Sequence, residues 1–306
     1  MTDKFPSPQT SKTGWPWTVK MPYLPNVMRN GRPWPKISIV TPSYNQGQFL
    51  EETIRSVLLQ GYPNLEYIII DGASRDNSVD IIKKYEPWLA YWVSEPDNGQ
   101  SHAINKGFKL ATGDIYSWIN SDDYYLEEAF RAVADAFVSL RQDAILLGYG
   151  NVVDTGGTFL DTRKIERIDN RTLLNWEENW FLQQACFWPS TCWNAVGGVN
   201  EGLELLMDYD LWFRFLKLYP FLYIDKPLGV LRYYQETKSQ TKRNRAFAEM
   251  AAVWVLNGGM DAALREIEKC VQEKNNIRQE LSRLERKPLL RILRKLGLFS
   301  FNGVLL

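Results

Sequence analysis

The first half of the chain alternates short apolar runs with amphipathic segments. The apolar runs have the length and β-branched content of buried strands, and they lie at 36–40, 65–70, 90–95 and 114–120. Each run is followed by a segment with apolar residues at helical spacing, such as FLEETIRSVLL. Strands that alternate with helices predict an α/β fold, in which a mostly parallel sheet is flanked by helices.

The pattern is different on either side of this region. Residues 1–35 are rich in Pro, Trp and polar residues, so we expect an irregular arm that lies over the domain. The segment AILLGYGNVVDTGGTFLDTR predicts two strands around a turn at Thr155-Gly156-Gly157. A mixed, aromatic region with a helix in DYDLWFRFLKL comes next, and a helical C-terminal part follows it. These changes divide the chain into 1–35, 36–140, 141–245 and 246–306.

Composition and charge narrow the class of protein. Lys+Arg and Asp+Glu balance at 36 each, which argues against a broad nucleic-acid-binding face. No apolar run reaches the roughly 18–20 residues that span a bilayer, and the N-terminus lacks the apolar core of a signal peptide. The three cysteines have no metal-ligand spacing, so we expect reduced thiols in a cytoplasmic protein.

Polar residues follow each of the four predicted strands. In an open parallel sheet, ligands bind beyond the carboxyl ends of the strands. Asp122 and Asp123 follow the fourth strand and repel each other when both are ionised, so they are either solvated turn residues or flank a positive group. The polar ends of the other strands favour a shared site. Carboxylates suit Mg²⁺ or Mn²⁺ together with substrate phosphates, and no phosphate-binding glycine loop is present.

Two segments, PKISIVTPSYNQGQFLEETIRSVLLQGYPNLEYIIIDGASRDNSVDIIKKY and SEPDNGQSHAINKGFKLATGDIYSWINSDD, resemble the nucleotide-binding half of family 2 glycosyltransferases. The resemblance covers about Pro35 to Tyr234 and implies the GT-A fold. It also implies that residues 36–140 bind a nucleotide sugar, and that residues 141–245 bind the acceptor and supply the catalytic base. The cofactor that it implies is Mn²⁺ or Mg²⁺.

The resemblance implies roles for individual donor-site residues. Ser121-Asp122-Asp123 matches the acidic motif, with Asp122 at the ribose and metal and Asp123 on the metal. Asn120 replaces the family's first acid, which removes one charge and leaves a side chain that only hydrogen-bonds. The base pocket is expected at Pro42, Ser43, Tyr44 and Asn45, with Asp71 on the uracil edge, and the ribose and diphosphate at Gly99, Gln100, Asn105 and Lys106.

The segment LLMDYDLWFRF resembles the family's E-D-x-D-L-W motif, with Met207 in place of Glu. The match implies that Asp208 is the general base that takes the proton of an acceptor hydroxyl. Its apolar and aromatic neighbours are expected to raise its pKa, as suits a base. A helix-capping role for Asp208 stays open, and Asp210 is expected to form a structural cap or ion pair.

Two basic segments each leave two interpretations open. LRYYQETKSQTKRNR resembles the family's closing loop, with Gln235 at the position of a histidine. Its cations Lys238, Lys242 and Arg243 either neutralise the leaving diphosphate or lie in solvent. The segment RKPLLRILRKLGLF either lies in an anionic membrane surface or packs on the domain or on a second subunit.

The function implied by the resemblance is inverting, metal-dependent sugar transfer from a nucleotide sugar to a hydroxyl group. A UDP-sugar is the expected donor, and a saccharide or lipid-linked molecule of polysaccharide, cell-envelope or glycolipid synthesis is the expected acceptor. The expected location is cytoplasmic, with peripheral contact at the inner face of the membrane. Two alternatives stay open, namely another metal-dependent enzyme that uses a nucleotide and a non-enzymatic sugar-nucleotide-binding or membrane scaffold protein.

Overall fold

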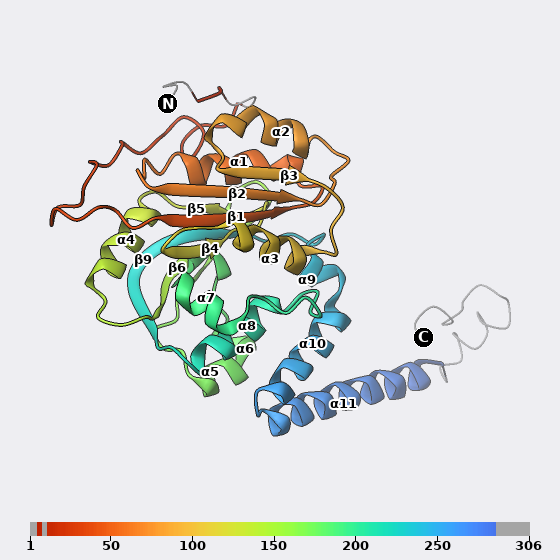
Figure 1. Cartoon of the computed structure of the whole chain (residues 1–306). Helices are drawn as coiled ribbons and strands as arrows, with labels where there is room; N and C mark the ends of the chain where they lie inside the picture. Colours follow the sequence, from red (N-terminus) through yellow and green to blue (C-terminus); the bar gives the residue numbers. More distant parts are fainter. Residues whose placement is uncertain (1–4, 8–10, 286–306) are drawn as a thin grey trace. The chain divides into compact units, whose positions relative to one another are not determined.

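The computed structural model describes residues 5–7 and 11–285, and the chain divides into two compact units, Met1–Glu249 and Met250–Leu306. The first unit holds one sheet with the strand order β3-β2-β1-β4-β8-β6-β9-β5, and β7 pairs with β6 (Figure 1). The strands are β1 Ile37–Ser43, β2 Leu65–Asp71, β3 Tyr91–Ser94, β4 Ile115–Trp118, β5 Tyr124–Tyr125, β6 Ile145–Val153, β7 Phe159–Arg163, β8 Cys186–Pro189 and β9 Phe221–Arg232.

The first four strands in the chain form the parallel part of the sheet. β1 pairs with β2 and β4, and β2 pairs with β3, all in parallel. The register sets Ser43 beside Asp71 and Asp71 beside Ser94, so the carboxyl ends of these strands share one edge. All residues of β1 and β4 are buried, as expected for strands covered on both faces. The prediction of an α/β fold with a mostly parallel sheet is confirmed.

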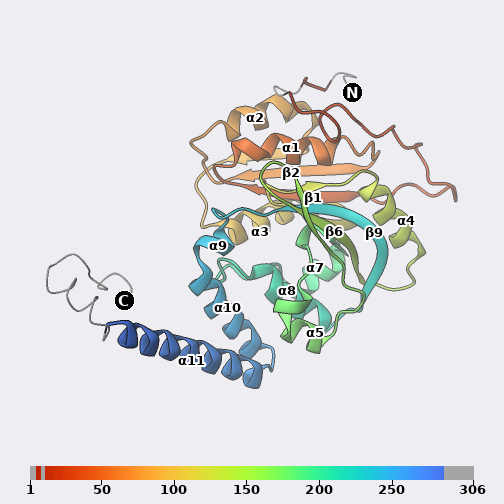
Figure 2. The same ribbon diagram turned by 180° about the vertical axis from the view of Figure 1, so that it is seen from behind.

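Helices follow the parallel strands as the apolar spacing predicts. α1 and α2 lie on one side of β1–β3 and α3 lies on the other (Figures 1 and 2). The helices of the first unit are α1 Gly47–Leu58, α2 Ser78–Tyr85, α3 Gln100–Leu110, α4 Ala129–Ser139, α5 Asn170–Leu174, α6 Trp176–Asn179, α7 Ser190–Val196, α8 Met207–Leu216 and α9 Lys238–Thr241. α10 Arg243–Leu256 crosses the boundary between the units, and α11 Met260–Glu285 belongs to the second.

A cluster of tryptophans packs α8 against the sheet. Trp212 of α8 stacks on Trp118 of β4, with ring centroids 6.2 Å apart, and meets Trp188 of β8 edge-on at 5.8 Å. All three side chains are fully buried. This packing fixes α8 relative to β4. Because β4 leads directly into the acidic motif, α8 is also positioned relative to that motif.

The β6–β7 hairpin is present as predicted, with antiparallel pairing and Gly157 in its turn at φ +87°. β8 and β9, from the aromatic region, add antiparallel and parallel neighbours to the sheet. No helix in the described part of the chain is both long and apolar enough to cross a membrane. The basic segment at 286–299 lies outside the described residues.

The described part of the N-terminal arm is irregular apart from a bridge between Val27 and Pro33. Arg55 of α1 anchors it, because its buried guanidinium donates to the carbonyl oxygens of Pro6, Pro16 and Trp17 at 2.9–3.0 Å. Without the arm, Nε and Nη2 would lose these acceptors, and Nη1 would keep only the Tyr85 hydroxyl at 3.0 Å, so the bonds hold the arm against α1.

Candidate functional site

The site begins at the edge where the parallel strands end. Asp71, at the end of β2, is fully buried, and its carboxylate accepts from the N–H and hydroxyl of Ser74 at 2.9 and 2.6 Å. The hydroxyl of Ser94 donates to the same carboxylate at 2.6 Å. Asp71 therefore holds the ends of β2 and β3 together. Its contact with a base stays a prediction.

The loop after β1 carries the expected base pocket. Pro42 and Ser43 are buried, and the Ser43 hydroxyl has no hydrogen-bond partner among the described residues. Tyr44 exposes 62% of its side chain, so its ring is free to meet a ligand. Asn45 takes a left-handed conformation at φ 52°, and its side chain accepts from the Arg75 N–H at 2.8 Å. A buried, unpartnered hydroxyl beside an open aromatic ring suits a polar, flat ligand.

The acidic pair follows β4, and its two carboxylates differ in their bonding. Asp123 is buried, and its carboxylate accepts from the Arg232 backbone N–H at 3.0 Å and from the Asn120 amide at 3.3 Å. Asp122 accepts from the Tyr234 hydroxyl at 2.8 Å. Burial raises the pKa of Asp122, and burial together with the neighbouring Asp122 raises the pKa of Asp123 well above its ordinary value. The positive charge that the protein places near Asp122 and Asp123 therefore does not fully balance two ionised carboxylates.

The donor atoms of this pair fit a hard divalent cation. Mg²⁺ and Mn²⁺ are held by one or two carboxylates and complete their coordination with water and substrate phosphates. Asp122 and Asp123 supply two adjacent carboxylates, and burial and their proximity raise the pKa of Asp123, so a cation between them would offset the repulsion. Within residues 5–7 and 11–285, no group of three or more His, Cys, Asp or Glu side chains could hold a metal alone.

Asn120 links the acidic pair to α3. Its side-chain oxygen accepts from the Gln100 amide at 2.8 Å, and its own amide donates to Asp123. Gln100 is the first residue of α3, and Gly99 before it has φ +107°, a conformation that favours glycine. The residue that replaces the family's first acid is therefore a hydrogen-bonded bridge.

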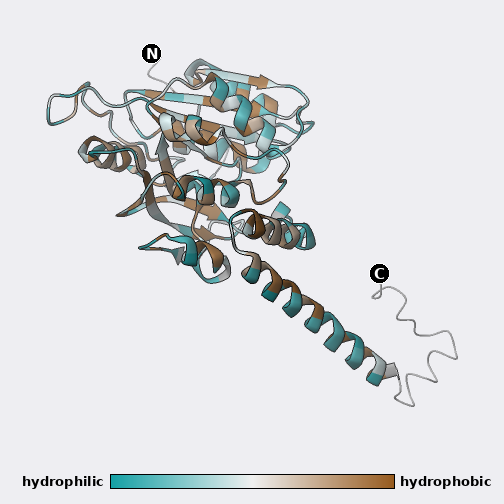
Figure 3. Ribbon diagram, turned by 60° about the horizontal axis from the view of Figure 1, so that its bottom comes forward, coloured by the Kyte–Doolittle hydropathy of each residue, from teal (hydrophilic) through white to brown (hydrophobic). Residues whose placement is uncertain are grey.

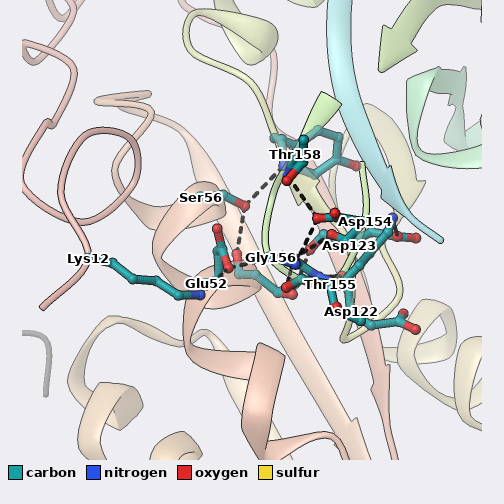
Figure 4. Close-up of polar contacts among 12 residues, drawn as sticks. Lys12, Glu52, Ser56, Asp122, Asp123, Asp154, Thr155, Gly156 and Thr158 are labelled. Atoms are coloured by element: carbon teal, nitrogen blue, oxygen red, sulfur yellow. Dashed lines mark hydrogen bonds and ion pairs between the residues drawn. The ribbon is translucent and has the colours of Figure 1, made fainter. Parts of the chain in front are cut away.

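Arg232, at the end of β9, is a buried cation that the sequence did not reveal. Its Nε donates to the Asp122 carbonyl at 3.1 Å, and its terminal nitrogens contact the Glu52 carboxylate at 3.0 Å and the Thr155 carbonyl at 3.2 Å. Glu52 of α1 also pairs with Lys12 of the N-terminal arm at 3.1 Å (Figure 4). The arm, α1, the hairpin turn and the acidic pair are thus joined by one network.

Tyr234 is a second contact that the sequence comparison missed. The closing-loop match pointed to Gln235, but that side chain is exposed, and Tyr234 reaches the acidic pair instead. The Tyr234 hydroxyl also accepts from the Gln46 amide at 3.2 Å, and its ring packs on Phe49 with centroids 5.4 Å apart. Neighbouring residues of an extended segment face opposite sides, so only the structure shows that Tyr234 and not Gln235 faces the acidic pair.

Asp208 lies half-buried in the first turn of α8. Its carboxylate accepts from the Tyr209 N–H at 2.7 Å, and burial raises its pKa to about 6. The raised pKa was expected from its apolar neighbours. The N-cap residue of α8 is Leu206, so Asp208 does not occupy the N-cap position, although its carboxylate does accept from an N–H of the first turn. Asp210 pairs with Arg214 at 2.8 Å, the structural ion pair that was predicted.

Glu249 of α10 holds the segment that leads into α8. Its carboxylate accepts from the backbone N–H groups of Glu204, Leu205 and Leu206 at 2.9–3.1 Å, and Arg245 pairs with it at 2.7 Å. Three N–H groups on one buried carboxylate fix the backbone immediately before Asp208. Glu249 lies more than forty residues beyond this segment in the sequence, so its role has no local signal.

Three further residues with a predicted role bond to other groups of the protein. The Asn105 amide bonds to the N–H and carbonyl of Val199 at 3.0 and 2.9 Å. Lys106 pairs with Glu95, and Lys242 pairs with Glu204. Lys238 is exposed at the start of α9, and Ser121 is buried next to the acidic pair. The donor contacts assigned to Asn105, Lys106 and Lys238 stay predictions.

Comparison with known proteins identifies the family. A model of glycosyl transferase family 2 matches residues 38–197. An uncharacterized glycosyltransferase of Rickettsia conorii is 28% identical over 216 residues, which are 68% of this chain and 36% of the relative. An uncharacterized glycosyltransferase of Mycobacterium tuberculosis is 40% identical over 92 residues, which are 30% of this chain and 35% of that protein. The chain thus spans only about a third of the length of these relatives.

Solved structures confirm the fold. TarS of S. aureus in complex with UDP-GlcNAc matches 71% of this chain and 66% of its own, with a TM-score of 0.57 and 18% identity. The mannosyltransferase PcManGT of Pyrobaculum calidifontis, in complex with GDP-Man and Mn²⁺, matches 85% and 86% with a TM-score of 0.53 and 16% identity. The sheet is that of the GT-A fold. The family model covers more than half of the chain, and the chain therefore belongs to glycosyl transferase family 2.

Proposed function

We propose that this glycosyltransferase is inverting and metal-dependent, and that it moves a sugar from a nucleoside diphosphate to an acceptor hydroxyl. The observation that carries the proposal is the half-buried carboxylate of Asp208, whose pKa is raised to about 6. A base works best when its pKa is near the working pH, because it is then ionised and still a strong enough acceptor. Glu249 supports this role by fixing the backbone before α8.

Asp208 acts on the acceptor. Its ionised carboxylate takes the hydroxyl proton as the acceptor oxygen forms a bond to the anomeric carbon, while the bond from that carbon to the diphosphate breaks. The electron pair of the broken bond leaves with the nucleoside diphosphate. A single displacement without a covalent intermediate inverts the configuration at the anomeric carbon.

The acidic pair would hold a divalent cation at the donor diphosphate. Asp123 and Asp122 would bind Mn²⁺ or Mg²⁺, which when bound stabilises the charge on the leaving diphosphate. Asp122 also faces the ribose, and Gly99, Gln100, Asn105 and Lys106 border the ribose and diphosphate. Ser121 shapes the motif, and Lys238 of α9 adds positive charge at the closing loop.

The donor is a UDP-sugar in this proposal. The unpartnered Ser43 hydroxyl, the open Tyr44 ring and the buried Asp71 carboxylate offer contacts for a pyrimidine, with Pro42 and Asn45 shaping the pocket. TarS binds UDP-GlcNAc, which supports the uridine assignment by analogy, and PcManGT with GDP-Man is the counterexample to test. The acceptor is a saccharide or a lipid-linked saccharide of polysaccharide, cell-envelope or glycolipid synthesis at the cytoplasmic face of the membrane.

The proposed roles are divided between consecutive parts of the chain. In this proposal residues 36–140 bind the donor and residues 141–245 bind the acceptor and carry the base, while residues 1–35 and 246–306 are the arm and the helical extension. Lys12 of the arm reaches the donor half through Glu52, which supports a structural role for the arm.

A donor panel tests the proposal. UDP- and GDP-sugars are incubated with Mn²⁺ or Mg²⁺ and saccharide acceptors, and release of nucleoside diphosphate is measured. We expect turnover that requires the cation and is lost by about 100-fold or more in Asp208→Asn, because the proton acceptor is gone. Donor affinity is expected to be unchanged. The matched control, Glu127→Gln, removes an exposed carboxylate outside the proposed site and is expected to retain turnover.

Two outcomes would favour the alternatives. An active Asp208→Asn variant would indicate a different reaction at the nucleotide site, such as nucleotidyl transfer or hydrolysis by water. Cation-dependent nucleotide binding without turnover on any acceptor would indicate a sugar-nucleotide-binding or scaffold protein. Proton NMR of the product would separate inversion from retention at the anomeric carbon.

A further inference from the structure

The helix α1 directs buried polar side chains at the segment that carries the acidic pair. The helices that flank the sheet carry hydrophilic as well as hydrophobic residues (Figure 3), and on α1 the side chains of Thr53 and Ser56 are fully buried. The Thr53 hydroxyl donates to the Asp123 carbonyl at 2.6 Å, and the Ser56 hydroxyl accepts from the Tyr125 N–H at 3.0 Å. Buried hydroxyl groups need such partners, so α1 holds the backbone of Asp123 and of the strand that follows it.

Tyr125 is held from a second side by the N-terminal arm. It lies in β5, the last strand in the order of the sheet, which pairs with β9 along one edge. The N–H and carbonyl of one strand residue point to the same side, and both groups of Tyr125 bond outside the sheet. Its N–H donates to Ser56, and its carbonyl accepts from the indole N–H of Trp15 at 2.8 Å. The arm and α1 therefore complete the outer edge of β5 together.

Trp15 is itself fixed within the arm. It lies in a turn in which the Thr18 N–H donates to the Gly14 carbonyl at 2.8 Å, and the Gly14 N–H donates to the Thr18 hydroxyl at 2.8 Å. Arg55 of α1 donates to the carbonyl of the next residue, Pro16, at 2.9 Å. The indole of Trp15 thus reaches β5 from a closed turn that is bonded to α1.

A second residue of the arm reaches the acidic pair through a buried ion pair. Lys12 contacts the Glu52 carboxylate at 3.1 Å (Figure 4), and Arg232 contacts the same carboxylate at 3.0 Å. Arg232 donates from its backbone N–H to the Asp123 carboxylate and from Nε to the Asp122 carbonyl. Lys12 therefore supports the ion pair whose arginine bonds to both acidic residues.

We propose that the N-terminal arm is a positioning element of the donor site, in which Trp15 and Lys12 hold the acidic pair in place. A turn closed by the bond from the Asp123 N–H to the Asn120 carbonyl joins β4 to β5, so a displacement of β5 moves the carboxylates. The arm lies outside residues 38–197, which the family model matches. The effect on a cation rests on the proposed metal-dependent transfer, whereas the positioning of the carboxylates does not.

Amide hydrogen exchange of the full chain tests the positioning without a cation. Trp15→Phe keeps an aromatic ring and removes the indole donor. Exchange of the backbone N–H groups of residues 122–126 is expected to be about threefold to tenfold faster, because the Tyr125 carbonyl loses its partner. The matched control Trp34→Phe removes an indole donor that bonds to the Pro25 carbonyl at 2.7 Å, before the amino end of β1. It is expected to leave exchange at 122–126 unchanged.

The affinity for Mn²⁺ tests the consequence for the donor site. It is measured by electron paramagnetic resonance of the free ion, with UDP or GDP present. Trp15→Phe is expected to weaken Mn²⁺ binding by about threefold to tenfold, and Lys12→Met by about twofold to threefold. Lys12→Arg keeps the charge beside Glu52 and is expected to retain the wild-type affinity. Trp34→Phe and Lys20→Met, an exposed lysine of the same arm, are the controls and should also retain it.

The two measurements separate the arm from the proposed reaction. Unchanged exchange at 122–126 in Trp15→Phe would overturn the positioning role. Faster exchange with wild-type Mn²⁺ affinity, or an equal loss of affinity in Trp34→Phe, would overturn the arm as an element of the donor site. Faster exchange in Trp15→Phe, together with a wild-type chain that binds no Mn²⁺, would support the positioning and contradict the metal-dependent transfer.

Discussion

A half-buried carboxylate with little hydrogen-bonding support is unstable in its ionised form, and Asp208 is such a group. Burial raises its pKa from 3.8 to about 6, and the backbone N–H groups of Tyr209 and of Asp208 itself offset only part of that effect. The folded state therefore binds a proton more tightly than the unfolded chain. Stability contributed by the protonated form is complete below about pH 4 and is lost as the pH rises to about 6.

The free-energy cost of the buried Asp208 charge predicts that a variant without this charge is more stable, although it lacks the proposed base. At neutral pH the Asp208→Asn variant is expected to be more stable by up to about 3 kcal/mol, because the neutral amide keeps the Tyr209 bond without the buried charge. Below pH 4 the two proteins should unfold alike. Urea unfolding at both pH values measures the difference. Equal stability of the two proteins at neutral pH would show that Asp208 is well solvated, which would weaken its assignment as the base.

Asn120 is a second residue whose substitution is expected to change stability in a definite direction. Asn120→Asp replaces a donor to Asp123 by a third carboxylate, so the metal-free variant is expected to lose about 1–3 kcal/mol. Mn²⁺ should recover more of this loss than it adds to the wild-type protein, as followed by thermal unfolding. Asn120→Ala, which removes the bonds but adds no charge, is the control and should gain nothing extra from Mn²⁺. An equal response of both variants would contradict a cation at this site.

At the scale of elements, Arg232 explains how separate segments meet at the acidic pair. It ends β9 and contacts α1 through Glu52, the hairpin turn through Thr155 and the acidic motif through the Asp122 carbonyl. The apolar spacing of β9 and α1 predicts that both are present, but not that a buried ion pair joins them. That pair forms only when the sheet brings residues 180 positions apart into contact.

A double-mutant cycle measures this junction. Arg232→Met leaves Glu52 buried without its guanidinium partner, and is expected to cost about 2–4 kcal/mol, because Lys12 still compensates part of the charge. Adding Glu52→Gln should cost less than the sum of the two single changes, with a coupling above about 1 kcal/mol. The exposed pair of Arg131 and Glu128 is the control, with coupling below about 0.5 kcal/mol. Additive changes at Arg232 and Glu52 would show that their pairing contributes nothing.

At the scale of the whole molecule, the chain divides into two compact units, and the sheet and its tryptophan cluster bury a core within the first. The acidic pair, Arg232 and Asp208 all belong to this first unit. The residues proposed to bind the donor and to activate the acceptor are therefore positioned by one packed core.

The sequence by itself determined the parallel half of the fold, the β6–β7 hairpin, the family and the strand ends that carry polar residues. These features depend on periodicity and on motifs whose parts lie close together in the chain. It also predicted the raised pKa of Asp208 and the ion pair of Asp210, because their apolar neighbours and Arg214 lie on the same helix.

Only the tertiary structure decided which side chains complete the site. It placed Tyr234 rather than Gln235 beside Asp122, buried Arg232 against Glu52, and brought Glu249 to the segment before α8. Each of these contacts joins residues more than forty positions apart. Buried polar groups need partners wherever they lie in the chain, so their pairing is set by the packed sheet and helices and not by local spacing.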